Sequence, residues 1–187
     1  MKIAWALIFG IVLWGCAKKP PTATPDIKYI VAGDSTGSYV HHVALNNAII
    51  NDLYLDIDKD GINDFQLLKS IQNSRGTLST GYVIYPSNQS SYVCVDSSVL
   101  TIVLKVGDTI QQSSGWINGN NILFLEDSNE LAPGPPFILP TVHWVNISDG
   151  YVGFKIIKNS QTLWGWMHIG GIKSKNFYIK DYAYTEY

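Results

Sequence analysis

Short runs of β-branched and aromatic residues, separated by glycine, asparagine, aspartate or serine, dominate the chain from residue 27 onward. Many of these runs alternate apolar and polar positions, which is the period of a strand with one buried face. The pattern predicts strands over residues 28–32, 49–56, 65–71, 80–85, 91–95, 100–106, 121–125, 138–146, 151–158, 161–169 and 177–184. No long helical period accompanies them. We therefore expect an all-β fold, a two-sheet antiparallel sandwich of the jelly-roll-like kind.

One connection between the predicted strands is short enough to define a pairing. Residues 158–161 read Lys-Asn-Ser-Gln and lie between two strongly apolar runs. Asparagine and serine favour tight turns. The strands on either side are therefore expected to form a hairpin.

The first residues of the chain have the character of a targeting segment. Lys2 precedes an apolar run over residues 3–14, which is short for a membrane span. The run ends in Leu13-Trp14-Gly15-Cys16, which resembles the lipobox of bacterial lipoproteins. That resemblance implies cleavage before Cys16 and acylation of its sulfur and amine. The alternatives are an ordinary signal peptide or a membrane anchor.

This interpretation divides the 187 residues into three parts. Residues 1–15 form the lipoprotein signal, residues 16–26 the lipidated cysteine with a proline- and threonine-rich tether, and residues 27–187 one β-sandwich domain. The lipid gives the chain a membrane as partner, because several acyl chains anchor a protein firmly. We expect the protein at the bacterial outer membrane or cell surface, outside the cytoplasm.

Charge and cysteine content narrow the functional classes further. The net formal charge is −2, Arg75 is the single arginine, and no basic cluster follows Lys18-Lys19. A nucleic-acid partner is therefore not expected. With Cys16 lipidated, Cys94 has no cysteine partner for an internal disulfide. Its alternating apolar neighbours predict a buried small side chain.

The strongest candidate for chemistry is an acidic loop that follows one predicted strand and precedes another. Carboxylates occupy positions 1, 3, 5 and 9 of residues 56–64, and Gly61 at position 6 permits a tight left-handed turn. Hard cations such as Ca²⁺ take six or more oxygen ligands. The candidate metal ligands are the side chains of Asp56, Asp58, Asp60 and Asp64 and the backbone carbonyl of Ile62.

This loop resembles the short DxDxDGxxD calcium loops of thrombospondin type 3 repeats and related bacterial extracellular loops. A helix–loop–helix calcium hand would instead need a glutamate at position 12, which here is Leu67. The resemblance implies a structural calcium ion as the cofactor. The alternative is an acidic turn that is solvated and holds no ion.

The residues that commonly build hydrolytic or zinc sites show no comparable pattern. The adjacent His41 and His42 would point to opposite faces of a strand, and His143 and His168 lie on separate predicted strands. Packing or surface hydrogen bonding is therefore the favoured role of the histidines. The chain has no distinguishable carboxylate pair outside the loop.

Tryptophans in the second half of the chain offer a different kind of site. Trp164 and Trp166 flank Gly165, so both would face the same side of a strand, and Trp116 precedes them. An exposed aromatic pair of this kind can hold a sugar ring. Core packing is favoured over this sugar platform, because Met167 and Ile169 would share the opposite face.

Scattered blocks of the chain also resemble a group of uncharacterised secreted bacterial proteins. The blocks are Gly150-Tyr151-Val152-Gly153-Phe154-Lys155, Trp164-Gly165-Trp166-Met167-His168-Ile169 and Asp181-Tyr182-Ala183-Tyr184, preceded by the acidic loop. The group implies a secreted β-rich domain and no activity. We therefore expect a non-catalytic, lipid-anchored envelope protein with a structural calcium loop. The alternatives are a carbohydrate-binding module, with a glycan or envelope protein as partner, and an envelope hydrolase.

Overall fold

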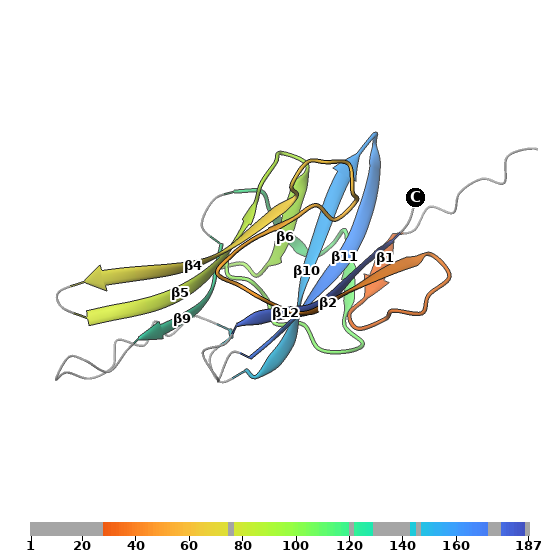
Figure 1. Ribbon diagram of the computed structural model, residues 1–187. Helices are drawn as coiled ribbons and strands as arrows, with labels where there is room; N and C mark the ends of the chain where they lie inside the picture. Colours follow the sequence, from red (N-terminus) through yellow and green to blue (C-terminus); the bar gives the residue numbers. More distant parts are fainter. Residues whose placement is uncertain are drawn as a thin grey trace, which may run out of the picture.

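A computed structural model of the chain describes residues 28–74, 77–119, 122–128, 143–144, 147–171 and 177–185. All regular secondary structure in these ranges is β-strand, so they contain no helix that could span a membrane. The strands form antiparallel sheets of six and four strands and a two-stranded ribbon (Figure 1). The predicted all-β antiparallel sandwich is confirmed.

The six-stranded sheet contains the last three strands of the chain at its centre and is antiparallel throughout. Its spatial order is β2 (Val40–Ile49), β12 (Tyr178–Thr185), β11 (Gln161–Gly170), β10 (Asp149–Lys158), β6 (Ser91–Val95) and β8 (Gly115–Ile117). The β10–β11 pair is the hairpin predicted from residues 158–161. Asn159 and Ser160 form its turn with φ of 51° and 65°, the left-handed conformation of tight hairpins.

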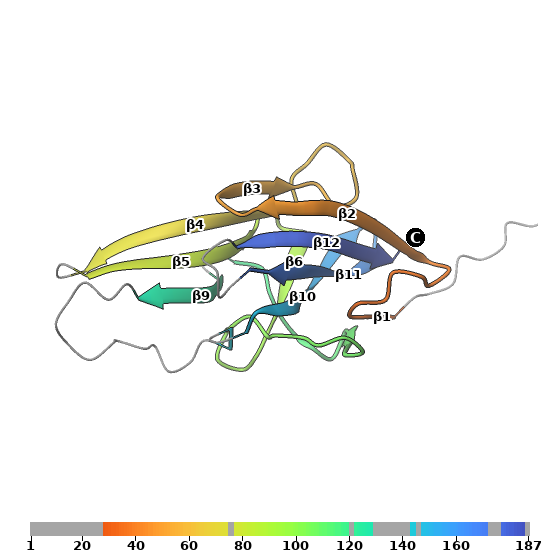
Figure 2. The ribbon, with the colours of Figure 1, turned by 60° about the horizontal axis from the view of Figure 1, so that its bottom comes forward.

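The four-stranded sheet is a meander followed by one later strand. Its order is β3 (Asp52–Leu55), β4 (Phe65–Ser74), β5 (Thr77–Pro86) and β9 (Ile122–Ser128). Figures 1 and 2 show the β4–β5 hairpin extending from the body of the sandwich, away from β1. The ribbon pairs β1 (Tyr29–Val31) with β7 (Thr109–Gln111).

The apolar residues of both large sheets meet in one inter-sheet core. Phe65 of β4 packs against Phe154 of β10, with ring centroids 5.3 Å apart, and both side chains are fully buried. Leu67 and Ile84 join them from the four-stranded sheet, and Met167 joins them from the six-stranded sheet. The period-2 alternation of each strand places these residues on the facing sides of the sheets.

A second buried cluster lies on the other face of the six-stranded sheet. Trp164 and Trp166 of β11 point into it, together with Ile30 of β1, Ile110 of β7 and Leu104 from the preceding loop. The ribbon and this loop therefore cover the face that would otherwise be exposed. Trp166 is further fixed by its indole N–H, which donates to a backbone carbonyl in the β1–β2 connection over 3.2 Å.

Three features of the fold differ from the sequence pattern. The run 49–56 is not one strand, because β2 ends at Ile49 and β3 begins at Asp52 in the other sheet. The run 100–106 forms no strand and makes isolated bridges at Thr101 and Leu104. Strands β2, β7 and β8 were not predicted. Most of the predicted strand 138–146 lies outside the described residues.

Candidate metal centre

The acidic loop joins two strands that are hydrogen-bonded neighbours. Leu55 ends β3 and Phe65 begins β4, and these residues pair directly. The amide of Asp64 donates to the Leu55 carbonyl over 2.7 Å, which closes the base of the loop. Between them the Ile57 side chain is fully buried in the inter-sheet core. The loop is therefore fixed at its base and within its first turn.

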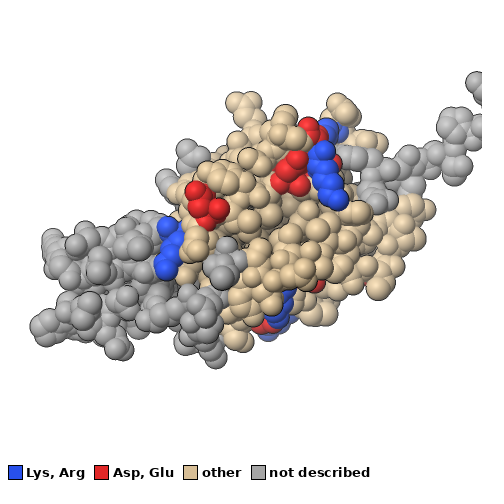
Figure 3. Space-filling view, in the orientation of Figure 1, with Lys and Arg blue, Asp and Glu red and all other residues tan. Residues whose placement is uncertain are grey.

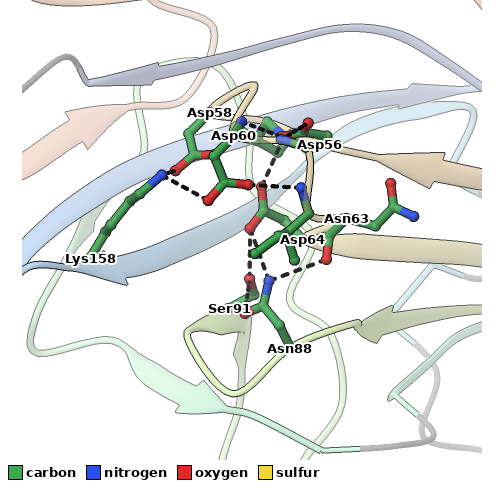
Figure 4. Close-up of polar contacts among 11 residues, drawn as sticks. Asp56, Asp58, Asp60, Asn63, Asp64, Asn88, Ser91 and Lys158 are labelled. Atoms are coloured by element: carbon green, nitrogen blue, oxygen red, sulfur yellow. Dashed lines mark hydrogen bonds and ion pairs between the residues drawn. The ribbon is translucent and has the colours of Figure 1, made fainter.

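Three of the predicted ligands converge. One oxygen each from Asp56, Asp58 and Asp64 lies within 4.8 Å of the others (Figure 4). Calcium–oxygen distances are about 2.3–2.6 Å, so ligands on opposite sides of one ion lie roughly 5 Å apart. The separation and the all-oxygen donor set fit a hard divalent cation. These three carboxylates can hold a metal ion.

Backbone amides of the loop orient the outer carboxylates. Asp56 accepts from the amides of Asp60 and Gly61 at 3.1 and 2.8 Å, and Asp58 accepts from the Asp60 amide at 3.2 Å. Gly61 has a φ of 88°, as the position of this glycine predicts, and Lys59 also adopts a left-handed conformation at 59°. The loop thus turns around its carboxylates, and its N–H groups face them.

Asp64 is the inner member of the cluster, 3% exposed. Its Oδ2 accepts from the Ile57 amide at 2.8 Å, and its Oδ1 accepts from Asn88 Nδ2 at 3.2 Å and Ser91 Oγ at 3.1 Å. Burial raises the pKa of Asp64 above its usual value, with a smaller contribution from Asp58, against these hydrogen bonds. The hydrogen bonds therefore hold the carboxylate in place, while its burial disfavours the charged form. A bound cation would offset this cost of burying the charge.

Asp60, the fourth predicted metal ligand, pairs with a lysine. Asp60 Oδ2 and Asp58 Oδ2 both bond the ammonium of Lys158, at 2.8 and 2.7 Å, and Asp60 is not one of the three converging carboxylates (Figure 4). The hydrogen bond from Lys158 lowers the pKa of Asp60, and the same contacts raise the pKa of Lys158. Lys158 thus supplies part of the positive charge that the loop requires. The role of the Ile62 carbonyl stays a prediction.

Sequence reasoning missed the residues that reach the loop from elsewhere. Lys158 ends β10 in the six-stranded sheet, while Asn88 and Ser91 come from the β5–β6 turn and the start of β6. No local pattern connects a lysine to aspartates about a hundred positions earlier. Only the pairing of the two sheets brings the hairpin end to the loop. The site therefore bridges three separate segments of the sandwich.

A second polar cluster surrounds His168 of β11. Its Nδ1 bonds Asp181 at 3.0 Å, its Nε2 bonds Asp149, and Tyr151 stacks on the ring at 4.4 Å. His42 of β2 bonds the other oxygen of Asp181 at 2.9 Å. Both nitrogens of His168 therefore join neighbouring strands.

The remaining histidines and Cys94 also have the roles expected of them. The His41 ring packs against the Tyr184 ring in a tilted arrangement with centroids 5.0 Å apart, and His143 bonds Asp96 at 2.6 Å. Cys94 is buried, and this burial raises the pKa of its thiol to about 11. It is therefore an inert small side chain at neutral pH. Cys16 lies outside the described residues.

The tryptophans do not form the exposed platform considered for a sugar. Trp164 and Trp166 are 3% and 2% exposed, because the second buried cluster covers both rings. Trp116 is half-buried against Trp164 with ring centroids 5.6 Å apart. The Lys155 ammonium lies 4.8 Å from the Trp116 ring. The expectation that these rings pack in the protein interior is confirmed for Trp164 and Trp166.

Comparison with known proteins gives no match: no protein-family profile, no curated protein and no solved structure is similar to this chain.

Proposed function

We propose that the chain is a lipid-anchored bacterial envelope protein, non-catalytic, in which Asp56, Asp58 and Asp64 bind a structural calcium ion. The observation that supports it most is the convergence of the three carboxylates at the junction of the two sheets. A cation there would tie the β3–β4 loop to the segments that carry Asn88 and Lys158. The ion would stabilise the fold, because the carboxylates that bind it also accept hydrogen bonds that tie the loop to the rest of the protein.

The identity of the ion follows from the ligands and the proposed location. Carboxylate oxygens select hard cations, and extracellular modules bind Ca²⁺ with dissociation constants of about 10⁻⁴–10⁻³ M. A protein anchored through Cys16 at the outer membrane or cell surface would encounter calcium at such concentrations. The ordered acidic loop and the N-terminal lipobox thus support the same extracytoplasmic setting.

A calcium titration tests the metal centre. The mature chain carrying Cys16→Ser is melted in EGTA and in Ca²⁺ at about 10 mM, roughly 10–100 times the dissociation constant. Calcium should then add about 1.4–2.7 kcal/mol to the free energy of unfolding, a shift of a few degrees in Tm. Asp58→Ala should abolish the shift, since it removes a converging ligand. Asp52→Ala, a change to an aspartate outside the loop, should keep it.

Two outcomes would contradict the metal centre. Equal melting temperatures in EGTA and Ca²⁺ would leave the loop as a solvated acidic turn. A calcium shift that persists in Asp58→Ala would place the ion elsewhere on the protein. A shift of equal size with Mg²⁺ would change the identity of the ion and leave the site in place.

The lipid anchor has a separate test in bacterial cells. The wild-type chain should incorporate labelled palmitate and fractionate with membranes, whereas Cys16→Ser should do neither, because the acyl chains attach at that residue. Cys94→Ser is the matched control and should be labelled normally. Unlabelled, soluble wild-type protein would show an ordinary signal peptide instead.

A further inference from the structure

A row of polar aromatic and amide side chains crosses the outer face of the four-stranded sheet. Tyr54 of β3 pairs with Gln66 of β4, and Gln66 pairs with Tyr85 of β5. Directly paired residues on adjacent strands point to the same face. Two strand spacings separate the tyrosines, about 9.5 Å. The row therefore presents two rings with an amide between them.

This row faces away from the core. Its strand neighbours Leu55, Phe65 and Ile84 are buried between the sheets, so the alternate positions point outward. Tyr54 is 51% exposed, and Tyr85 is half-buried. The molecule thus keeps a large aromatic side chain at a position where an ordinary sheet surface would carry a charged one.

Hydrogen bonds within the row fix Tyr54. The Gln66 amide nitrogen donates to the Tyr54 hydroxyl over 2.6 Å and to an Asp52 carboxylate oxygen over 3.1 Å. Because the amide nitrogen is used in this way, the Tyr54 hydroxyl proton and the Gln66 carbonyl oxygen remain to bond a ligand. The ring orientation is therefore set before any ligand arrives, which lowers the entropic cost of binding.

The row forms the floor of a surface groove of 630 Å³. The acidic loop supplies one wall through Ile62 and Asn63, and the chain after β5 supplies Ser87. None of the groove's described lining residues is charged. On the face of the molecule shown in Figure 3, charged side chains are few and form small separate groups.

We propose that this groove binds a neutral oligosaccharide, with Tyr54 and Tyr85 as platforms for the C–H faces of two sugar rings. The described lining residues carry no charge that could pair with a phosphate or a carboxylate, so nucleic acids and acidic glycans are not the preferred ligand. Amide and hydroxyl groups beside flat amphipathic rings match a ligand whose faces are apolar and whose edges are hydroxyls. This site is distinct from Trp116, Trp164 and Trp166, and it goes beyond the structural role of calcium.

Affinity gel electrophoresis tests the proposal. The full chain, in a detergent without sugar headgroups, is run at millimolar Ca²⁺ through native gels containing a soluble β-glucan, a mannan, a xyloglucan or a galactan. Acidic counterparts are alginate and polygalacturonate. At least one neutral polysaccharide should retard the wild type. Tyr54→Ala and Tyr85→Ala should each weaken that binding about tenfold or more, as loss of a central aromatic anchor does.

Tyr39→Ala is the matched control. Tyr39 is 48% exposed, nearly the same as Tyr54, and it lies just before β2, outside the groove's lining. This variant should be retarded like the wild type. Melting curves of all three variants should coincide, because both substituted groove positions lie on the outer face.

The proposal is overturned by any of four results. These are no retardation in any neutral polysaccharide, retardation only in the acidic ones, retardation that both groove variants retain, and loss of binding in Tyr39→Ala as well. Because the gels read binding and the calcium titration reads stability, failure of this proposal is distinguishable from failure of the metal centre.

Discussion

Asp64→Ala should lower the free energy of unfolding by about 4 kcal/mol in Ca²⁺ at about 10 mM. Two losses add. One is the stabilisation by calcium, about 1.4–2.7 kcal/mol at roughly 10–100 times its dissociation constant. The other is the penalty of leaving the buried Ile57 amide without its acceptor, about 1–3 kcal/mol, whereas Ser91 Oγ keeps Asn88 Oδ1 as an acceptor at 3.0 Å. Urea unfolding in Ca²⁺ and in EGTA separates them, since only the second loss persists in EGTA.

Asp64→Asn is the control that separates charge from hydrogen bonding. Its amide oxygen can still accept from the Ile57 amide, but the negative charge that a cation requires is gone. In EGTA this variant should lose less stability than Asp64→Ala, because it keeps an acceptor for the Ile57 amide, although its amide nitrogen then faces the donors of Asn88 and Ser91. In Ca²⁺ it should show no stabilisation. An Asp64→Ala protein that keeps the full calcium response would contradict the metal centre.

The sequence predicts the convergence of carboxylates within the acidic loop, but it does not predict the contacts that distant segments make with the loop. The aspartates on either side of Gly61 predict a loop that turns around its carboxylates, and Asp56, Asp58 and Asp64 do converge. The spacing does not show that Asp60 would meet Lys158, because that contact depends on how two sheets pack. The same limitation applies to Asn88, which reaches Asp64 from the β5–β6 connection between the two sheets.

Strand prediction succeeded where the pattern was strongly apolar and failed at the sheet margins. The strand Ser91–Val95 and the β10–β11 hairpin occur where predicted. Strand β2 lies at the edge of its sheet and carries His41, His42 and two asparagines, so its sequence lacks a clear apolar face. Its strand conformation comes from pairing with β12. Strands β7 and β8 have three residues each, too few for a period to appear.

The covered second face of the six-stranded sheet explains the role of the tryptophans. Alternation correctly placed Trp164 and Trp166 on one face and Met167 on the other. Alternation alone cannot show whether a face meets solvent, and here the β1–β7 ribbon covers it. Aromatic residues suited to a ligand lie instead on the outer face of the other sheet, where single tyrosines on separate strands form a row only after pairing.

Gly165→Ala is the second change for which we expect a large effect, a loss of about 3 kcal/mol or more in the free energy of unfolding. Gly165 pairs with Phe154 across β10 and β11, and the phenyl ring lies over the glycine. A Cβ at residue 165 would have three atoms of that ring within 2.6 Å. The ring cannot easily move, because it is fully buried against Phe65 of the opposite sheet. Urea unfolding of the variant measures the loss.

A double-mutant cycle shows whether this clash is the cause. Phe154→Ala alone should cost about 3–5 kcal/mol through the cavity that it leaves in the inter-sheet core. Combined with Gly165→Ala it should cost less than the sum of the two single changes, because the added methyl group then fills space that the ring vacated. Gly119→Ala is the control, since its nearest neighbour lies at 3.8 Å, and it should change stability by less than about 0.5 kcal/mol. Strict additivity of the two core changes would show that Gly165 is required for a reason other than the Phe154 ring. A combined cost smaller than the sum would instead show that the Phe154 ring, which packs between the two sheets, requires a glycine at residue 165.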